Sequence, residues 1–179
     1  MVNLCPQNLV YQNEHEKVPY FSNPCLKKIK DKATEKFQST IKIANIFYRT
    51  AGTIASQQQY SLATFMLHQA TEFTLRAFIN LFMGGEQKTH TIAQLKNHTS
   101  RISPTLYAVL TPSNKEEEHL FSLLEEAYLK GRYDSGFEVL PKDFNQLHDI
   151  VNTLLAAAKS EFDIYIKNLE DLINLNKRL

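Results

Sequence analysis

Apolar residues recur every three or four positions from residue 23 to residue 55, which is the spacing of one buried stripe on an α-helix. Asn23 is a good N-cap residue, and Pro24 suits the first helical position, so we expect the helix to begin here. The stripe fades at Ser56. Its members are Leu26, Ile29, Ala33, Phe37, Ile41, Ala44, Tyr48, Ala51 and Ala55.

A second helix is predicted from about Tyr60 to Met83, where apolar residues cover more than half of the helical circumference. Such wide coverage is expected of a helix that packs on several sides. Gly84 and Gly85 supply the conformational freedom that ends helices. The wide apolar coverage also leaves a stripe that a second chain could cover, so a homodimer is expected.

Two capping boxes mark the next helix starts. Thr91 with Gln94 opens a short helix that is expected to fade before Pro104. Ser113 with Glu116 opens a third long helix, which is expected to stop at Gly131. In each box the hydroxyl can accept from the backbone N–H three residues later, and the Gln or Glu side chain there can accept from the backbone N–H of the hydroxyl residue.

The last predicted helix begins at about Lys142 and carries apolar residues three or four apart as far as Ile173. No segment alternates with the period of two that a strand requires. The fold class predicted is therefore all-α, an up-and-down helical bundle of four long helices plus a short helix. Residues 1–22 are predicted to form an irregular N-terminal arm, and residues 23–179 a single bundle domain.

Charge and cysteine content narrow the function classes. The chain has 20 basic and 19 acidic residues, so the strong uniform field of a bulk nucleic-acid or membrane binder is missing, while a local basic patch stays open. Cys5 and Cys25 are too few for a structural zinc site and are interpreted as reduced thiols. With no signal peptide or membrane span in the pattern, we expect a cytoplasmic protein with no membrane contact.

Familiar catalytic motifs are missing from the sequence: it has no Gly-x-Gly-x-x-Gly, P-loop, His-Glu-x-x-His or Gly-x-Ser-x-Gly segment. We therefore expect no cofactor, no bound metal and no catalytic residue of these kinds.

The segment "FMLHQATE" places His68 and Glu72 one helical turn apart, with Gln69 and Arg76 on neighbouring parts of the same surface. The pair has the spacing of two metal ligands, but a metal site needs three or four. A polar pair hydrogen-bonded inside the bundle or at a dimer contact is the interpretation we favour, because buried polar groups must find partners.

His68 and Glu72 are candidates for binding a nucleotide or phosphate, and two further groups join them. Lys88 and His90 precede a helix start, where free N–H groups favour an anion. Arg132 and Tyr133 follow a helix, where an arginine can grip a phosphate and a tyrosine can stack on a base. A plain cap and a solvated helix end explain the same residues without a ligand.

Three segments, "YSLATFMLHQATEFTLRAFI", "KTHTIAQL" and "LLEEAYLKGRYD", resemble the HEPN domain family in their order and spacing. The resemblance spans roughly residues 30–170 once the flanking helices are included. Thr91 stands where the family usually has Asp, and Asp134 stands where it usually has Pro.

This resemblance implies an α-helical bundle, commonly homodimeric, of a kind found beside or fused to minimal nucleotidyltransferases. Toxin ribonucleases of the family use an Arg followed after four to six residues by a His. None of the five arginines here has a His in that window, so the chain resembles the non-nuclease branch.

The function we predict is a non-catalytic HEPN-type module that binds a nucleotide, a separately encoded nucleotidyltransferase, or both, as a homodimer. One alternative is a toxin-type ribonuclease or other phosphoryl-handling enzyme of a toxin–antitoxin pair, whose site joins His68, Glu72, His90 and Arg132 and whose substrate is RNA. Another is a purely structural interaction bundle. Convergence of those four side chains in one pocket would favour binding or catalysis.

Overall fold

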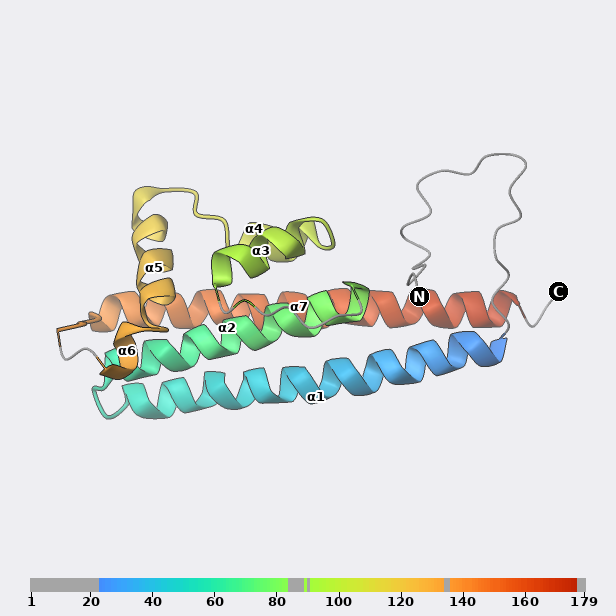
Figure 1. Ribbon diagram of the computed structural model, residues 1–179, viewed down its shortest axis with the longest axis horizontal. Helices are drawn as coiled ribbons and strands as arrows, with labels where there is room; N and C mark the ends of the chain where they lie inside the picture. The colour runs from blue at the N-terminus through green and yellow to red at the C-terminus, as the bar shows by residue number, and fades with distance from the viewer. Residues whose placement is uncertain (1–22, 84–88, 90, 134–135, 177–179) are drawn as a thin grey trace.

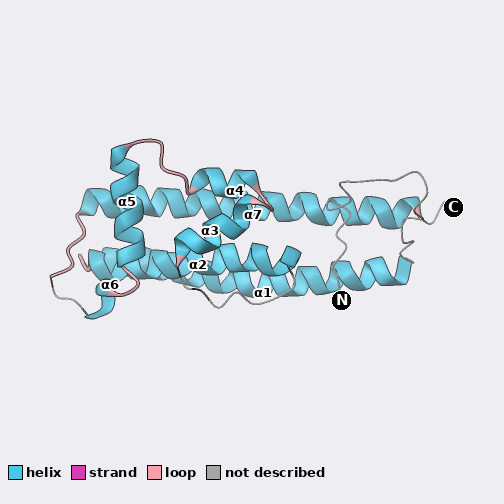
Figure 2. Cartoon of the chain, turned by 45° about the horizontal axis from the view of Figure 1, so that its top comes forward, coloured by secondary structure: helices cyan, strands magenta, loops and turns pink. Residues whose placement is uncertain are grey.

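The structure, a computed structural model, describes residues 23–83, 89, 91–133 and 136–176, without the side chains of residues 23, 24, 83 and 132. Seven helices make up this part of the chain (Figure 1). They are α1 (Asn23–Ala55), α2 (Tyr60–Met83), α3 (Ile92–Ser100), α4 (Pro104–Val109), α5 (Lys115–Glu126), α6 (Lys130–Tyr133) and α7 (Pro141–Leu175). The described residues contain no strand (Figure 2), which confirms the all-α helical bundle.

The three longest helices, α1, α2 and α7, lie side by side, and α1 runs antiparallel to the other two (Figure 1). The short helices α3 to α5 lie on the opposite side of the bundle from α1 in both views. Helix α5 stands across the long axis, and α6 packs against the start of α2. The chain between α2 and α7 thus covers one side of the bundle and leaves α1 at its edge.

Alanines allow α1 and α2 to approach each other closely. Ala44 and Ala51 of α1 and Ala63 and Ala70 of α2 have no exposed surface. Small side chains at a contact shorten the distance between helix axes. Larger residues of α2, such as Phe78, are buried on its other sides, so α2 packs on several sides, as its apolar coverage predicted.

Helices α1 and α7 continue beyond the end of α2 as a pair (Figure 1). Phe37 and Phe162 stack across this pair with ring centroids 4.0 Å apart. Tyr165 of α7 meets Phe82, which lies at the end of α2, with the two rings 5.2 Å apart. Each fully buried side chain of this size contributes about 1.5–3 kcal/mol, so aromatic contacts hold the extension together.

The helix ends differ from prediction in several places. Thr91 is the N-cap of α3, but its side chain makes no capping hydrogen bond, so the predicted box with Gln94 is wrong. The N-cap of α5 is Asn114, whose side chain accepts from Glu117 N, one residue later than the predicted Ser113–Glu116 box. Both Ser and Asn are good N-cap residues, and in this helix Asn114 is the one that caps.

Two short helices were not predicted. The short helix α3 ends before Pro104, as predicted, but a new helix, α4, starts there: Ser103 Oγ accepts from Leu106 N, and Pro104 is at the first position. Helix α5 ends at Glu126, and Gly131 lies inside α6 instead of stopping a long helix. A Cβ at Gly131 would lie 3.0 Å from the Ser61 carbonyl oxygen, so the glycine permits close packing on α2.

Candidate functional site

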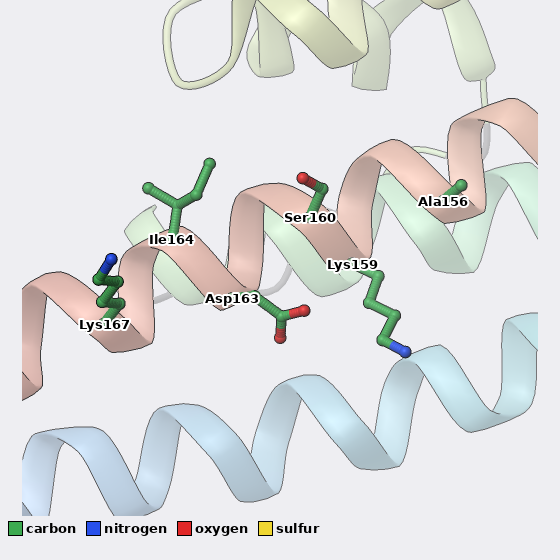
Figure 3. Close-up of a pocket in the computed structure, with 6 residues that line it drawn as sticks. All are labelled: Ala156, Lys159, Ser160, Asp163, Ile164 and Lys167. Atoms are coloured by element: carbon green, nitrogen blue, oxygen red, sulfur yellow. The ribbon is translucent and has the colours of Figure 1, made fainter.

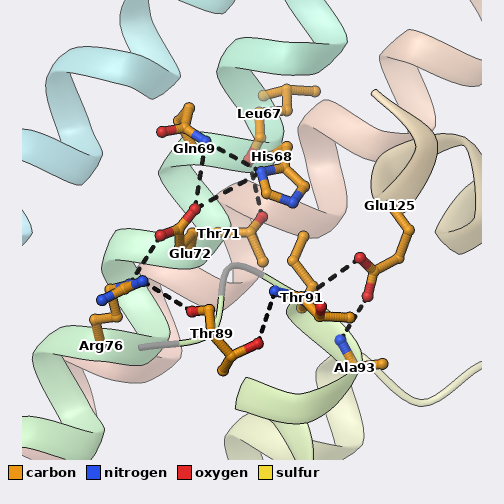
Figure 4. Close-up of polar contacts among 11 residues, drawn as sticks. Leu67, His68, Gln69, Thr71, Glu72, Arg76, Thr89, Thr91, Ala93 and Glu125 are labelled. Atoms are coloured by element: carbon orange, nitrogen blue, oxygen red, sulfur yellow. Dashed lines mark hydrogen bonds and ion pairs between the residues drawn. The ribbon is translucent and has the colours of Figure 1, made fainter. Parts of the chain in front are cut away.

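A buried group of polar side chains lies along α2 (Figure 4). We define the α2 polar cluster as His68, Gln69, Glu72 and Arg76. His68 has no exposed surface and Glu72 is 3% exposed, although both belong to residue types that usually meet water. Helical spacing places them one turn apart, as predicted. The elements that pack around α2 keep both side chains out of contact with water.

The Gln69 side-chain amide links the two buried groups of the cluster. Its Nε2 donates to Glu72 Oε2 at 3.3 Å and lies 3.2 Å from His68 Nδ1. His68 Nδ1 itself lies 4.0 Å from that carboxylate oxygen, too far for a direct hydrogen bond. Gln69 therefore bridges the imidazole and the carboxylate.

Arg76 connects the cluster to another part of the chain. Its Nε lies 2.8 Å from Glu72 Oε1, and its Nη2 donates to the Thr89 carbonyl oxygen at 2.8 Å. Thr89 in turn accepts a hydrogen bond from Thr91 N through its hydroxyl. The guanidinium therefore joins α2 to the segment that leads into α3 (Figure 4).

The ring of His68 packs against Tyr128, which follows α5, with centroids 5.1 Å apart and a tilt of 34°. Tilted aromatic pairs of this kind stabilise a contact beyond the area that they bury. The α2 polar cluster thus touches the chain on both sides of the short helices, at Thr89 and at Tyr128.

The anion position at the start of α3 is occupied by a side chain of the protein itself. Glu125 of α5 accepts from Ile92 N at 3.3 Å and from Ala93 N at 2.5 Å. A carboxylate here neutralises the free N–H groups and the positive end of the helix dipole. Sequence reasoning missed Glu125, because nothing local links a residue to a helix start 32 positions earlier.

The predicted binding residues divide into two groups. His68 and Glu72 come together on α2. Lys88 and His90 lie outside the described residues, as does the side chain of Arg132, whose backbone belongs to α6. The Tyr133 side chain is 81% exposed.

Two surface pockets in the described part of the chain lie away from the α2 polar cluster. One is on the outer surface of α7 (Figure 3), lined by Ala156, Lys159, Ser160, Asp163, Ile164 and Lys167. The other, between α3 and α5, includes Lys96, Phe121 and Glu125. Neither is lined by His68 or Glu72, so neither pocket joins the residues that the sequence singled out.

A second polar contact, which sequence reasoning also missed, joins α1 to α7. Tyr48 Oη and His148 Nδ1 are 3.1 Å apart, and the two rings stack at 4.3 Å. Burial lowers the pKa of His148, and burial together with the charge of Asp149 raises the pKa of Tyr48. Both shifts favour the neutral forms, as expected of a hydrogen-bonded pair between helices.

The described residues contain no group of three or more His, Cys, Asp and Glu side chains placed to hold a metal ion. Among the helices that the structure describes, none is long and apolar enough to cross a membrane.

The described part of the chain is an all-α bundle with a buried His–Glu pair in its second helix. The model of the HEPN domain family matches residues 37–176, and the chain belongs to that family. A search of curated proteins gave no match. Membership indicates a nucleotide- or RNA-related role, and HEPN domains commonly dimerise.

Proposed function

We propose that this protein is a non-catalytic HEPN module that acts as a homodimer and binds a nucleotide, a separately encoded nucleotidyltransferase, or both. The observation that carries the proposal is the burial of the α2 polar cluster. Its hydrogen bonds run within α2 and to the segment before α3, which is an arrangement that holds helices in place.

The burial of His68 and Glu72 argues against their use as catalytic groups. A general base must reach the proton that it removes, through hydrogen-bond distance or one water. His68 has no exposed surface, and its Nδ1 is already in contact with the Gln69 side-chain amide at 3.2 Å. The missing Arg–His spacing of the family's ribonucleases supports the same conclusion.

The dimer contact that we propose lies on α1 and α2 around the ring contact of Phe47 with Phe73, whose centroids are 5.6 Å apart. Met66 of α2 is half-buried, and Ile43 and Ile46 of α1 are 41% and 55% exposed. Large exposed apolar side chains that gather on one surface mark interaction sites. A second copy of the chain would cover this surface, in agreement with the dimers common in the family.

The nucleotide-binding residues that we propose are Lys88, His90, Arg132 and Tyr133, and His68 and Glu72 would support the fold. We also propose that residues 23–179 form one domain that follows an irregular arm, and that the protein acts in the cytoplasm. The buried cluster supports this division of roles because Arg76 binds the carbonyl of Thr89, directly beside Lys88 and His90 in the sequence.

Light scattering tests the dimer with two matched variants. Ile46 of α1 and Ile164 of α7 are both isoleucines, 55% and 54% exposed. We expect Ile46→Glu to give a monomer, because it places a charge in the contact, whereas Ile164→Glu should keep twice the chain mass. A wild-type monomer at high protein concentration would refute the proposed dimer.

Melting temperature in the presence of nucleoside mono-, di- and triphosphates tests the binding role. A ligand that binds the folded state alone raises the melting temperature, and Arg132→Gln should abolish the rise. Lack of any shift with every nucleotide would leave only partner binding.

RNA incubated with the protein and a chelator should stay intact; cleavage abolished by His68→Ala or His90→Ala would overturn the non-catalytic assignment.

A further inference from the structure

The pocket between α3 and α5 has no part in the function proposed above. Its cavity volume is about 390 Å³, within the range of about 300–1,000 Å³ that is usual for small-molecule sites. In both views α3 and α5 point in different directions, and the pocket lies in the angle between them (Figures 1 and 2). None of its lining residues belongs to the α2 polar cluster or to the nucleotide-binding residues that we propose.

Glu125 closes the narrow end of this angle. One of its carboxylate oxygens accepts from Ile92 N at 3.3 Å and the other from Ala93 N at 2.5 Å, which joins α5 to the start of α3 (Figure 4). The two N–H groups and the positive end of the helix dipole offset the charge of this carboxylate. Glu125 therefore fixes the two walls of the pocket relative to each other and leaves little charge for a ligand.

Apolar side chains form much of the remaining lining. Ile92 and Leu110 are buried, and Pro112 and Phe121 are half-buried. The partly exposed surface of Pro112 and Phe121 can still be covered, and covering apolar surface with an apolar group is favourable in water. The pocket therefore suits a ligand with an apolar side chain.

Two side chains of opposite charge line the pocket without a charged partner in the described part of the chain. Lys96 of α3 is half-buried; its Nζ donates to the Leu110 carbonyl oxygen at 3.3 Å and lies 5.1 Å from the centroid of the Tyr107 ring. These two contacts hold the ammonium group in place but do not neutralise it. Glu118 of α5 is exposed and makes no hydrogen bond or ion pair with any described residue.

The charges that remain available to a ligand are thus one positive and one negative. A nucleotide fits poorly, because its phosphates would meet the carboxylates of Glu118 and Glu125 as well as the ammonium group of Lys96. A metal ion fits poorly too, because it needs several oxygen ligands and Glu118 alone is unengaged. A molecule that carries one charge of each sign matches both walls.

We propose that this pocket binds a short zwitterionic peptide, of two or three residues, with an apolar side chain. The peptide carboxylate pairs with Lys96, its ammonium group pairs with Glu118, and its side chain packs on Phe121. Lys96 and Glu118 are on different helices and do not pair with each other, so the ligand must hold its charges apart. The ends of two or three extended residues lie about 7 or 10 Å apart.

The chemistry of the pocket separates such a peptide from its closest relatives. A single amino acid carries both charges on one carbon atom and cannot reach the two walls together. One end of a long chain supplies only one of the two terminal charges. The pocket shares no residue with the proposed nucleotide site, so this proposal goes beyond that function and does not depend on it.

Calorimetry on the full chain tests the proposal with three probes. They are the dipeptide leucylphenylalanine, its N-acetyl derivative, which lacks the ammonium group, and its C-terminal amide, which lacks the carboxylate. We expect the amide to bind about tenfold more weakly than the dipeptide, because Lys96 is half-buried and bonds to charged groups are strong there. The N-acetyl form should bind about threefold more weakly, because Glu118 is exposed.

Variants of the two charged residues should reproduce these losses selectively. Glu118→Gln should weaken the dipeptide about threefold and leave the N-acetyl form unchanged. Lys96→Gln should weaken the dipeptide about tenfold and leave the amide unchanged. Each variant and its matching probe make a double-mutant cycle, so a general loss of folding would be seen as an equal loss with every probe. Lys115→Gln and Glu138→Gln remove the same charges from exposed positions outside the pocket and should bind the dipeptide like the wild type.

A variant that fills the pocket and keeps its charges completes the test. Ala93 lines the pocket with an exposed side chain, so Ala93→Phe should fold, which circular dichroism checks, and should abolish dipeptide binding. Four results would overturn the proposal: no binding of the dipeptide at millimolar concentration, equal affinity for the three probes, equal losses in pocket and control variants, or free leucine or phenylalanine binding as tightly as the dipeptide.

Discussion

Two ion pairs of similar length show how differently the protein uses the same chemistry. Glu72 and Arg76 of α2 are 2.8 Å apart with side chains 4% and 17% exposed. Glu116 of α5 and Lys142 of α7 are 2.6 Å apart, but 55% and 72% exposed. Water competes for the second pair and is nearly absent from the first. The distance between the charges therefore says little about what each pair contributes, and the surroundings decide.

The largest effect is expected at the buried pair. Glu72→Gln keeps the shape of the side chain but leaves the Arg76 guanidinium without its charged partner in a poorly hydrated site. We expect a loss of about 3 kcal/mol in the free energy of unfolding, since breaking a buried pair strands the remaining charge. Urea unfolding measures it, with Glu170→Gln on the exposed Lys30 pair as the control. Similar losses of unfolding free energy in both variants would show that burial does not make an ion pair contribute more to stability.

An intermediate loss of stability is expected when the Glu125 cap of α3 is removed. Its carboxylate accepts from Ile92 N and Ala93 N, and the side chain is half-buried. Glu125→Gln should cost about 1 kcal/mol, because it weakens a helix cap and removes a negative charge from the start of α3. Hydrogen exchange should show the loss first in α3. No change relative to the exposed Glu118→Gln would mean that the cap contributes nothing.

His148, half-buried between α1 and α7, should make the stability of the protein depend on pH. Burial lowers its folded-state pKa, so between that value and the ordinary pKa of about 6.5 the unfolded chain binds the proton and the folded chain does not. Its contribution to stability is thus complete above about pH 6.5 and is lost as the pH falls below that value. We expect wild-type stability to drop more between pH 7.5 and 5.5 than that of His148→Gln. Equal drops in the two proteins would contradict this assignment.

The smallest effect is expected at the exposed pair. Hydrogen bonds from Lys142 and Gln146 lower the pKa of Glu116, and the Glu116 carboxylate raises the pKa of Lys142, but both side chains remain in water. Lys142→Gln should leave the unfolding midpoint unchanged within error at 150 mM salt. A shift as large as that of Glu72→Gln would show that exposure does not separate the two pairs.

The long helices could be predicted because each carries its own signal. The apolar period and the Asn23–Pro24 start define α1, and α2 begins and ends at the predicted Tyr60 and Met83. The pairing of His68 with Glu72 follows from helical spacing alone. Burial of that pair was inferred correctly from the apolar residues that surround it on almost every side of α2.

The contacts that could not be predicted are those between distant parts of the chain. Glu125 caps a helix 32 residues earlier, Arg76 binds the carbonyl of Thr89, and Tyr48 pairs with His148 a hundred residues away. A polar residue in a sequence shows what it can bond, but not which element packing brings to it. The break between α5 and α6 likewise depends on the close approach of Gly131 to α2.

The central claim, that the α2 polar cluster supports the fold and does no chemistry, is tested most directly by measuring nucleotide affinity and unfolding on the same samples of wild type and Glu72→Gln. Calorimetry with the nucleotide that shifts the melting temperature most, at a temperature where both proteins are folded, gives the affinity per folded molecule. We predict a large loss of stability with affinity unchanged within about threefold, since a folded variant keeps its binding surface. Unchanged stability with abolished binding would contradict the account and make His68 and Glu72 the centre of a functional site.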